Sequence, residues 1–299
     1  MVNKDFPIPV RSIGPGSQPP EEADVDVMPM PHSMSSFEMP RVPERVSPAA
    51  MRESADALQH MVDALGAWDA AADPRGAGPR LGLDALSPEA LEVTNQVLGE
   101  GEVSIRLATA PAVHIQESVF AGLWRCGELG NDGRLVRYWL EAGSVPQSVF
   151  EAARSVDAAL VDPQPWPEGA MNSPAVLAEL RAKLGSAGVG GRNGQINLTL
   201  LPLSGADREV IDAALPTGPV SILSRGFGHC EVGSTAVRGL WRVQFFNSMR
   251  TLILDTIEIA ELPDAVSASP EDLGDSRTRL AELVRWMNEP AGDDQAHAR

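Results

Sequence analysis

The sequence repeats a set of short motifs at one fixed spacing, and this repeat limits the possible folds more than any other feature. Gly122-Leu123-Trp124-Arg125 recurs 117 positions further on as Gly239-Leu240-Trp241-Arg242. Gly101 with Val103-Ser104-Ile105 recurs as Gly218 with Val220-Ser221-Ile222 at the same offset. Chance matching of one short motif would not give an ungapped series, so we interpret the sequence as a tandem duplication.

Both copies follow the same local pattern of a capped helix and then strands. Ser87 and Ser204 are each suited to cap a helix, because a serine hydroxyl accepts a hydrogen bond from a free backbone N–H of the first turn. Apolar residues then alternate over 103–107 and over 134–141, and the Gly-Leu-Trp-Arg strand lies between these two ranges. A helix followed by a three-stranded antiparallel meander predicts an α+β fold, with two such units packed in approximate twofold symmetry.

The repeat divides the chain into two units with flanking segments. Proline, methionine and acidic residues dominate the first 46 residues, a composition typical of a flexible tail. The predicted segments are a tail over 1–46, a helix and linker over 47–82, a first repeat over 83–155, a connecting loop and helix over 156–195, a second repeat over 196–268, and a C-terminal helix from about Asp275 with a tail over 269–299.

Composition excludes several classes of protein. The 299 residues carry a net charge of −17, which would repel the phosphates of a nucleic acid. No apolar run approaches the ~20 residues of a membrane span, and the prolines near the start do not fit a secretory signal, so we expect a cytoplasmic protein. The two cysteines, Cys126 and Cys230, are too few for a disulfide framework or for a metal cluster of their own.

Motifs for catalysis or cofactor binding are missing from the sequence. The glycine-rich stretch 185–194 follows a predicted helix and lacks the G-x-G-x-x-G spacing, and no P-loop, H-E-x-x-H or G-x-S-x-G motif occurs. His229-Cys230 is the one adjacent pair of soft metal ligands, and a site there would need ligands from elsewhere. We therefore expect no cofactor, no metal site and no enzymatic activity.

Two groups of residues are candidates for partner binding. Tryptophan and arginine are enriched in interface hot spots, which selects Trp124, Arg125, Trp241 and Arg242, although a repeated strand motif is also typical of a repeated core. Glu100, Glu102, Gln116 and Glu117 form a polar, mainly acidic group in the first copy. The second copy carries Thr217, Pro219, Gly233 and Ser234 at these positions. This difference in charge is consistent with a division of labour, or with a solvated acidic turn.

Several longer motifs resemble one known family. They are IGPGSQP at 13–19, LGEGEVSIR at 98–106, IQESVFAGLWR at 115–125, LEAG at 140–143, MNSP at 171–174, INLTLLPLS at 196–204, VRGLWR at 237–242 and SPEDLGDSRTRL at 269–280. In this order they resemble the hydrogenase expression/formation family called HupH or HyaF, and HoxQ in some bacteria. The resemblance covers nearly the whole chain.

The resemblance implies a non-catalytic maturation chaperone for an uptake [NiFe] hydrogenase. Such a protein acts on the iron–sulfur small-subunit precursor before its export, often with a thioredoxin-like companion. An acidic protein could attract an arginine-bearing precursor, which predicts binding that weakens as salt is added. The alternatives are a scaffold or iron–sulfur and redox handling factor that uses Cys126, Cys230 or His229 jointly with a partner, and an enzyme with an unfamiliar site.

Overall fold

The computed structural model describes residues 46–289, with gaps at 71, 73–75, 187–193 and 227–228. The flexible tail predicted for residues 1–46 falls outside the described residues except for Val46. Most of the glycine-rich stretch 185–194 also falls outside them.

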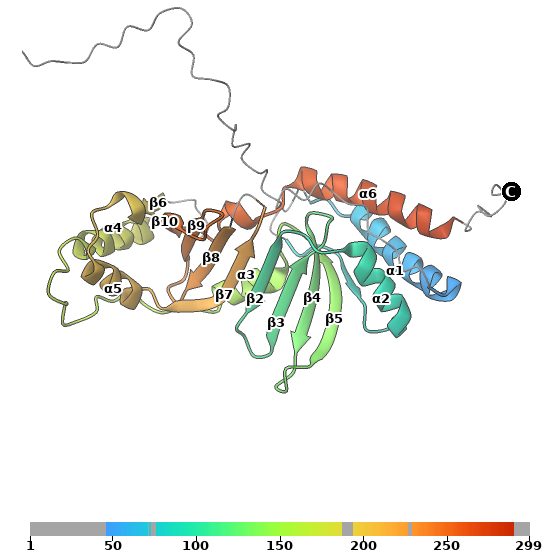
Figure 1. Ribbon diagram of the computed structural model, residues 1–299, viewed down its shortest axis with the longest axis horizontal. Helices are drawn as coiled ribbons and strands as arrows, with labels where there is room; N and C mark the ends of the chain where they lie inside the picture. Colours follow the sequence, from blue (N-terminus) through green and yellow to red (C-terminus); the bar gives the residue numbers. More distant parts are fainter. Residues whose placement is uncertain (1–45, 71, 73–75, 187–193, 227–228, 290–299) are drawn as a thin grey trace, which may run out of the picture.

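One antiparallel sheet runs through the whole molecule (Figure 1). In the described residues its strands follow the order β1-β5-β4-β3-β2-β7-β8-β9-β10-β6. The strands are β1 (Arg80–Gly82), β2 (Val103–Leu107), β3 (Ala112–Glu117), β4 (Leu123–Leu129), β5 (Leu135–Ala142), β6 (Gly194–Asn197), β7 (Thr217–Ser224), β8 (His229–Thr235), β9 (Leu240–Phe246) and β10 (Leu252–Ile259).

The helices cover the sheet unevenly (Figure 1). Helices α1, α2 and α6 pack on one end of the sheet, and α4 and α5 pack on the other. The short helix α3 packs on the opposite face near the middle, against a central apolar cluster. The helices are α1 (Pro48–Ala67), α2 (Pro88–Leu98), α3 (Gln147–Arg154), α4 (Ser173–Ser186), α5 (Gly205–Ala214) and α6 (Pro270–Asn288), with 3-10 turns at Leu198–Leu200 and Asp264–Val266.

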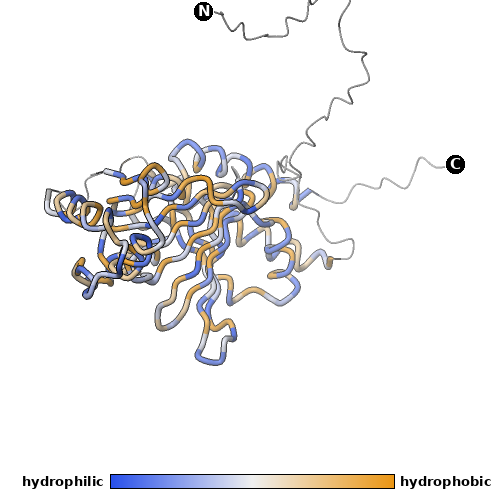
Figure 2. Tube along the Cα trace, turned by 60° about the vertical axis from the view of Figure 1, so that its left-hand side comes forward, coloured by the Kyte–Doolittle hydropathy of each residue, from blue (hydrophilic) through white to orange (hydrophobic). Residues whose placement is uncertain are grey.

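Alternation along the strands explains these layers. On β4, Leu123 enters the cluster beneath α1, α2 and α6, whereas Trp124 and Cys126 enter the central cluster on the other face. The apolar residues gather along the strands and helices of the body, and the tip of the lowest hairpin is hydrophilic (Figure 2). In the described residues no helix covers the middle of the face that carries α2 and α5, which is therefore open and polar.

The α+β fold class is confirmed, but the number of strands in each unit was wrong. Each unit contains four meander strands, because β3 and β8 were missed. On β3 only Val113 and Ile115 are buried, so the apolar alternation is too short to stand out in the sequence. The C-terminal helix begins at Pro270, earlier than the predicted start near Asp275. Ser269 caps this helix and forms a capping box with Asp272.

The two units meet at the centre of the sheet with a symmetric register. Strand β2 pairs with β7, and Ile105 lies opposite Ile222, its own counterpart 117 positions later. Val103 and Leu107 lie opposite Ser224 and Val220, which gives the register that a twofold axis through the central pair requires. The tandem duplication remains a prediction from the sequence.

Candidate functional site

The Gly-Leu-Trp-Arg motif adopts one local geometry in both halves. Gly122 and Gly239 have φ angles of 78° and 79°, in the left-handed region that favours glycine. The indole nitrogen of Trp124 donates to the Gly143 carbonyl at 2.9 Å, and that of Trp241 donates to Ala260 at 3.1 Å. Both tryptophans are 0–1% exposed, so neither indole is accessible to a partner in this structure. The structure places these two candidates in the central core.

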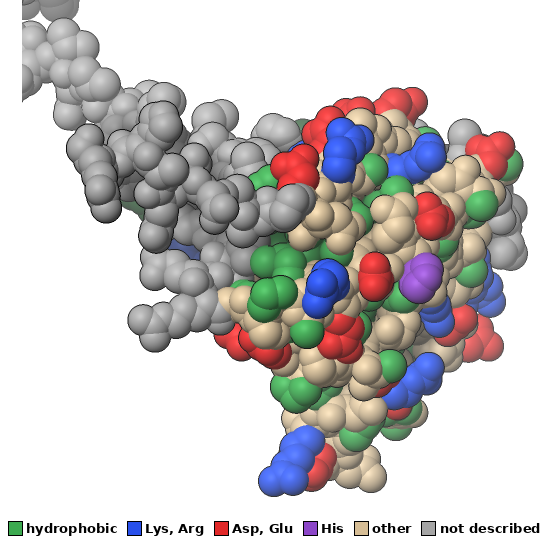
Figure 3. Space-filling view, turned by 90° about the vertical axis from the view of Figure 1, so that its right-hand side faces the viewer, with side chains coloured by type: hydrophobic (Ala, Val, Ile, Leu, Met, Phe, Trp, Pro, Cys, Tyr) green, Lys and Arg blue, Asp and Glu red, His purple; other side chains and the backbone are tan. Residues whose placement is uncertain are grey.

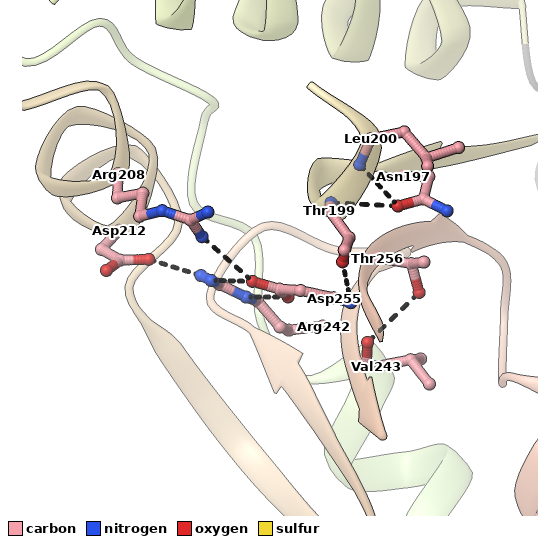
Figure 4. A network of polar contacts seen from close by, with 9 residues as sticks. All are labelled: Asn197, Thr199, Leu200, Arg208, Asp212, Arg242, Val243, Asp255 and Thr256. Atoms are coloured by element: carbon pink, nitrogen blue, oxygen red, sulfur yellow. Dashed lines mark hydrogen bonds and ion pairs between the residues drawn. The ribbon is translucent and has the colours of Figure 1, made fainter. Parts of the chain in front are cut away.

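The arginine that follows Trp241 belongs to an ion-pair cluster (Figure 4). Arg242 donates to the two carboxylate oxygens of Asp255 through Nε at 2.8 Å and Nη2 at 2.7 Å, and it also contacts Asp212 on α5. Arg208 approaches the same Asp255 carboxylate at 3.9 Å. Burial alone would lower the pKa of Arg242, but the aspartates outweigh burial and raise it. Arg242 therefore fixes α5 to the sheet.

The corresponding arginine of the first half has a neutral hydrogen-bond partner and one distant carboxylate neighbour. Arg125 Nη1 donates to Asn95 Oδ1 at 3.3 Å, and the hydroxyl of Tyr138 donates to the same oxygen at 2.7 Å. The exposed carboxylate of Glu100 lies 4.0 Å from Arg125 Nη2. Arg125 Nε is buried without a hydrogen-bond partner among the described residues. The first half thus holds its arginine less tightly than the second.

The polar group predicted in the first half is brought together at the start of β2 and the end of β3. Glu100 and Glu102 are exposed, whereas the amide of Gln116 donates to three backbone carbonyls of Gly101, Val103 and Glu117. The side chain of Gln116 therefore connects the end of β3 to the start of β2.

Glu117 differs from the other carboxylates of this group. Burial raises the pKa of Glu117 to about 7, with further contributions from the charges of Glu102 and Asp272. Backbone hydrogen bonds from Gly122 and Val103 oppose this shift. Glu117 consequently titrates near neutral pH, next to the Gly-Leu-Trp-Arg turn.

The open face of the sheet contains a hollow of about 840 Å³ in the second half. Its floor is formed by β2, β7, β8 and β9, and one wall is the end of α5. At Gly233 a Cβ atom would have no neighbour within 4 Å, whereas Gln116 fills the equivalent position of the first half. The difference between Gln116 and Gly233 is visible in the sequence, but by itself it does not predict a hollow.

Three arginines at the hollow were also missed. Arg106, Arg225 and Arg250 are exposed, line the hollow and form no side-chain ion pair with any described residue. They come from three separate strands or turns and share no sequence motif, so only the sheet brings them together.

The thiols and histidine named in the sequence analysis are not arranged for shared chemistry. Cys126 and Cys230 are both buried free thiols, and burial raises the pKa of Cys126 well above its usual value and that of Cys230 to about 11. His229 contacts Glu231 at 2.9 Å. Within the described residues no group of three or more His, Cys, Asp or Glu side chains is placed to hold a metal ion.

The end of the molecule that carries α1, α2 and α6 shows acidic, basic and apolar side chains interspersed (Figure 3). None of the described helices combines the length and the apolar character needed to cross a membrane.

Comparison with known proteins decides the family. Residues 57–162 and 170–287 match the conserved region described as "HupH hydrogenase expression protein, C-terminal conserved region", and each stretch contains one Gly-Leu-Trp-Arg motif. The chain belongs to the HupH family of hydrogenase expression proteins.

Individual relatives match over nearly their full length. The hydrogenase expression/formation protein HoxQ of Cupriavidus necator is 42% identical, over 94% of this chain and 98% of that protein. HupH of Rhodobacter capsulatus is 37% identical over the same shares, and the hydrogenase-1 operon protein HyaF of Escherichia coli is 30% identical over 93% and 96%. A solved structure, the hydrogenase expression protein HupH from Thiobacillus denitrificans, matches 40% of this chain and 97% of its own, with 27% identity and a TM-score of 0.36.

Proposed function

We propose that this HupH-family protein is a non-catalytic accessory protein in hydrogenase maturation, and that it binds the iron–sulfur small-subunit precursor of an uptake [NiFe] hydrogenase in the cytoplasm before export. The observation that carries the proposal is full-length similarity to relatives named hydrogenase expression/formation proteins. A thioredoxin-like companion protein is part of the same proposal.

The geometry supports binding rather than a reaction on a small molecule. The residues selected from the sequence lie on one sheet or just before β2, and among them two tryptophans pack in the core and Arg242 holds a helix. Glu100 and Glu102 are exposed just before β2, where their carboxylates are accessible to a cationic partner. Long-range attraction between this acidic surface and an arginine-bearing precursor would mainly raise the rate of association.

Co-purification and salt dependence test the proposal. Tagged protein from cells that express a hydrogenase operon should carry the small-subunit precursor with it, and deletion of the gene should lower hydrogenase activity. The affinity for purified precursor should fall as ionic strength rises, because salt screens exposed charges. An affinity that does not change with salt removes the electrostatic part, and a precursor that does not bind removes the target.

A matched pair of variants separates local from overall charge. Glu100→Lys with Glu102→Lys should slow association with the precursor, because both side chains lie in the proposed contact region. Glu168→Lys with Glu209→Lys changes the net charge equally at exposed positions on the other half. Equal slowing by the two double variants would show that total charge matters and that the Glu100 region does not.

The redox alternative gives a different result in the same cells. If a cysteine handled electrons or a cluster, Cys126→Ser with Cys230→Ser would abolish hydrogenase maturation while the protein remained folded. We expect maturation to persist, since both sulfurs are buried and both pKa values are raised, which keeps them as thiols at neutral pH.

A further inference from the structure

The hollow carries more arginines than carboxylates in a protein that is strongly acidic overall. Its two carboxylates already have partners, because Asp212 pairs with Arg242 and Glu231 contacts His229. Arg106 lies on β2, Arg225 directly follows β7, and Arg250 lies in the turn between β9 and β10. None of the three side chains forms an ion pair with a described residue, although the chain carries 41 acidic and 24 basic residues. Unpaired arginines gathered at a concave surface favour a ligand that carries carboxylates.

The remaining lining suits an extended peptide. Ser104 and Ser221 are polar groups on the floor, whereas the half-buried Leu223 offers an apolar contact. An extended chain presents alternate residues to opposite sides, so a segment that alternates acidic and small apolar residues could meet both kinds of lining.

The first half carries different residues at the positions equivalent to those of the hollow. Gln116 fills the place of Gly233, and the positions equivalent to Arg225 and Arg250 are Ala108 and Gly133. The arginines therefore do not belong to the common framework of the two halves, and they accompany the one hollow that Gly233 leaves open.

A segment of complementary charge exists within the same chain. Between residues 12 and 37 the sequence contains no lysine or arginine, and residues 20–27 read PEEADVDV, with Glu21, Glu22, Asp24 and Asp26. In the second part of this segment acidic residues alternate with alanine and valine, which matches the mixed lining of the hollow.

The length of the intervening chain permits contact with the hollow. Asp26 is followed by 19 residues before Val46, the first described residue. That stretch spans at most about 65 Å when fully extended, at ~3.4 Å per residue, which allows wide coverage of the molecule. A tethered segment competes at an effective concentration that reaches the millimolar range, so even weak individual contacts give substantial occupancy.

We propose that residues 20–27 of this chain bind in the Arg106–Arg225–Arg250 hollow. This inference is independent of the identity of the hydrogenase precursor. It assigns an intramolecular contact to a charged surface that the Gly-Leu-Trp-Arg motifs do not use.

Paramagnetic broadening in the full-length protein tests the contact. A nitroxide attached at Ala23→Cys keeps all four carboxylates, and the native cysteines are buried, so the label reacts at one position. We expect the backbone amide signals of Ser221, Gly233 and Gln244 to lose at least half their intensity at low salt. The amides of α3, on the opposite face, should be unaffected.

Charge variants decide whether the arginines are responsible. Arg106→Glu with Arg225→Glu should remove the broadening, whereas Arg238→Glu with Arg285→Glu, an equal charge change at exposed positions outside the hollow, should leave it. Changing Glu21, Glu22, Asp24 and Asp26 to arginine in the double-glutamate variant should restore it.

Three results would overturn the proposal. The first is absence of broadening when the spin-labelled chain has no charge substitution, and the second is broadening of another surface. The third is broadening of the same amides in a mixture of spin-labelled chains without nitrogen-15 and nitrogen-15 chains without the spin label. The last result would show contact between separate molecules. Circular dichroism of each variant verifies that a lost signal does not result from unfolding.

Discussion

The two halves hold the same arginine at the same position but give it different partners. Arg242 contacts Asp212 and Asp255, whereas Arg125 contacts Asn95, which also accepts a hydrogen bond from Tyr138. At the 117-residue offset Asp212 corresponds to Asn95 and Asp255 corresponds to Tyr138. Each aspartate of the second half is therefore replaced by a neutral residue in the first half. One backbone framework can therefore carry either an arginine paired with two aspartates or an arginine whose Nε has no hydrogen-bond partner among the described residues.

Removing the central carboxylate should have the largest effect on stability. Asp255→Asn leaves Arg242 partly buried with Asp212 as its remaining carboxylate, and it should lower the free energy of unfolding by about 3 kcal/mol. Tyr138→Phe at the equivalent position removes one hydrogen bond and should cost about 1 kcal/mol. Urea denaturation of both variants measures the difference, and equal losses would refute the asymmetry of the two clusters.

Alanine substitutions of the two motif glycines should lower the free energy of unfolding by different amounts, and this difference should be smaller than the one between Asp255→Asn and Tyr138→Phe. Both have a left-handed φ, which costs alanine about 1–2 kcal/mol. A Cβ at Gly122 would also lie 2.5 Å from the Leu273 side chain, whereas at Gly239 the nearest atom is the Ala260 carbonyl oxygen at 3.7 Å. We expect Gly122→Ala to cost about 1 kcal/mol more than Gly239→Ala in thermal or urea unfolding. The reverse order would contradict the contact with α6.

The substitutions Gln116→Gly and Gly233→Gln should give the next largest effect on stability. Gln116→Gly removes an amide with three carbonyl partners and should destabilise the protein by about 1–2 kcal/mol. Gly233→Gln introduces a side chain into open space and should change stability by less than about 0.5 kcal/mol. It should also reduce the broadening that a label at residue 23 produces, which connects the packing difference to the proposed contact.

The pH dependence linked to Glu117 should appear as a loss of stability between about pH 4.5 and about pH 7. Its pKa rises from 4.5 to about 7 on folding, so the folded state binds the proton more tightly than the unfolded state. The contribution of Glu117 to stability is therefore favourable at low pH and is lost as pH rises from about 4.5 to about 7. Glu117→Gln should flatten this part of the curve of melting temperature against pH, and Glu100→Gln, an exposed control, should not.

Much of the framework was predictable because it follows from local patterns. Ser87 and Ser204 cap their helices as predicted. The strand β3 was missed because its two buried residues give too short an alternation, and its backbone is satisfied by strands on both sides. Neighbouring strands in a sheet supply information that no local pattern contains.

The candidate site was less predictable than the fold. Alternation along a strand places Trp and Arg of each motif on opposite faces, but it does not indicate which face is covered. The tryptophans lie in the core, and Arg242 is fixed by aspartates from α5 and β10. Arg106, Arg225 and Arg250 carried no signal in the sequence, since an isolated arginine is typical of any surface.

The sequence by itself determined the repeat, the helix starts, the α+β class and the resemblance to the HupH family, because caps, alternation and ordered motifs are local properties of the chain. The tertiary structure decided which residues meet. Pairing of β2 with β7 joins the two halves, and the side chains at Gln116 and Gly233 decide that one half is closed and the other is hollow. These features depend on the distance between residues that lie far apart in the chain, which is fixed only when the sheet has formed.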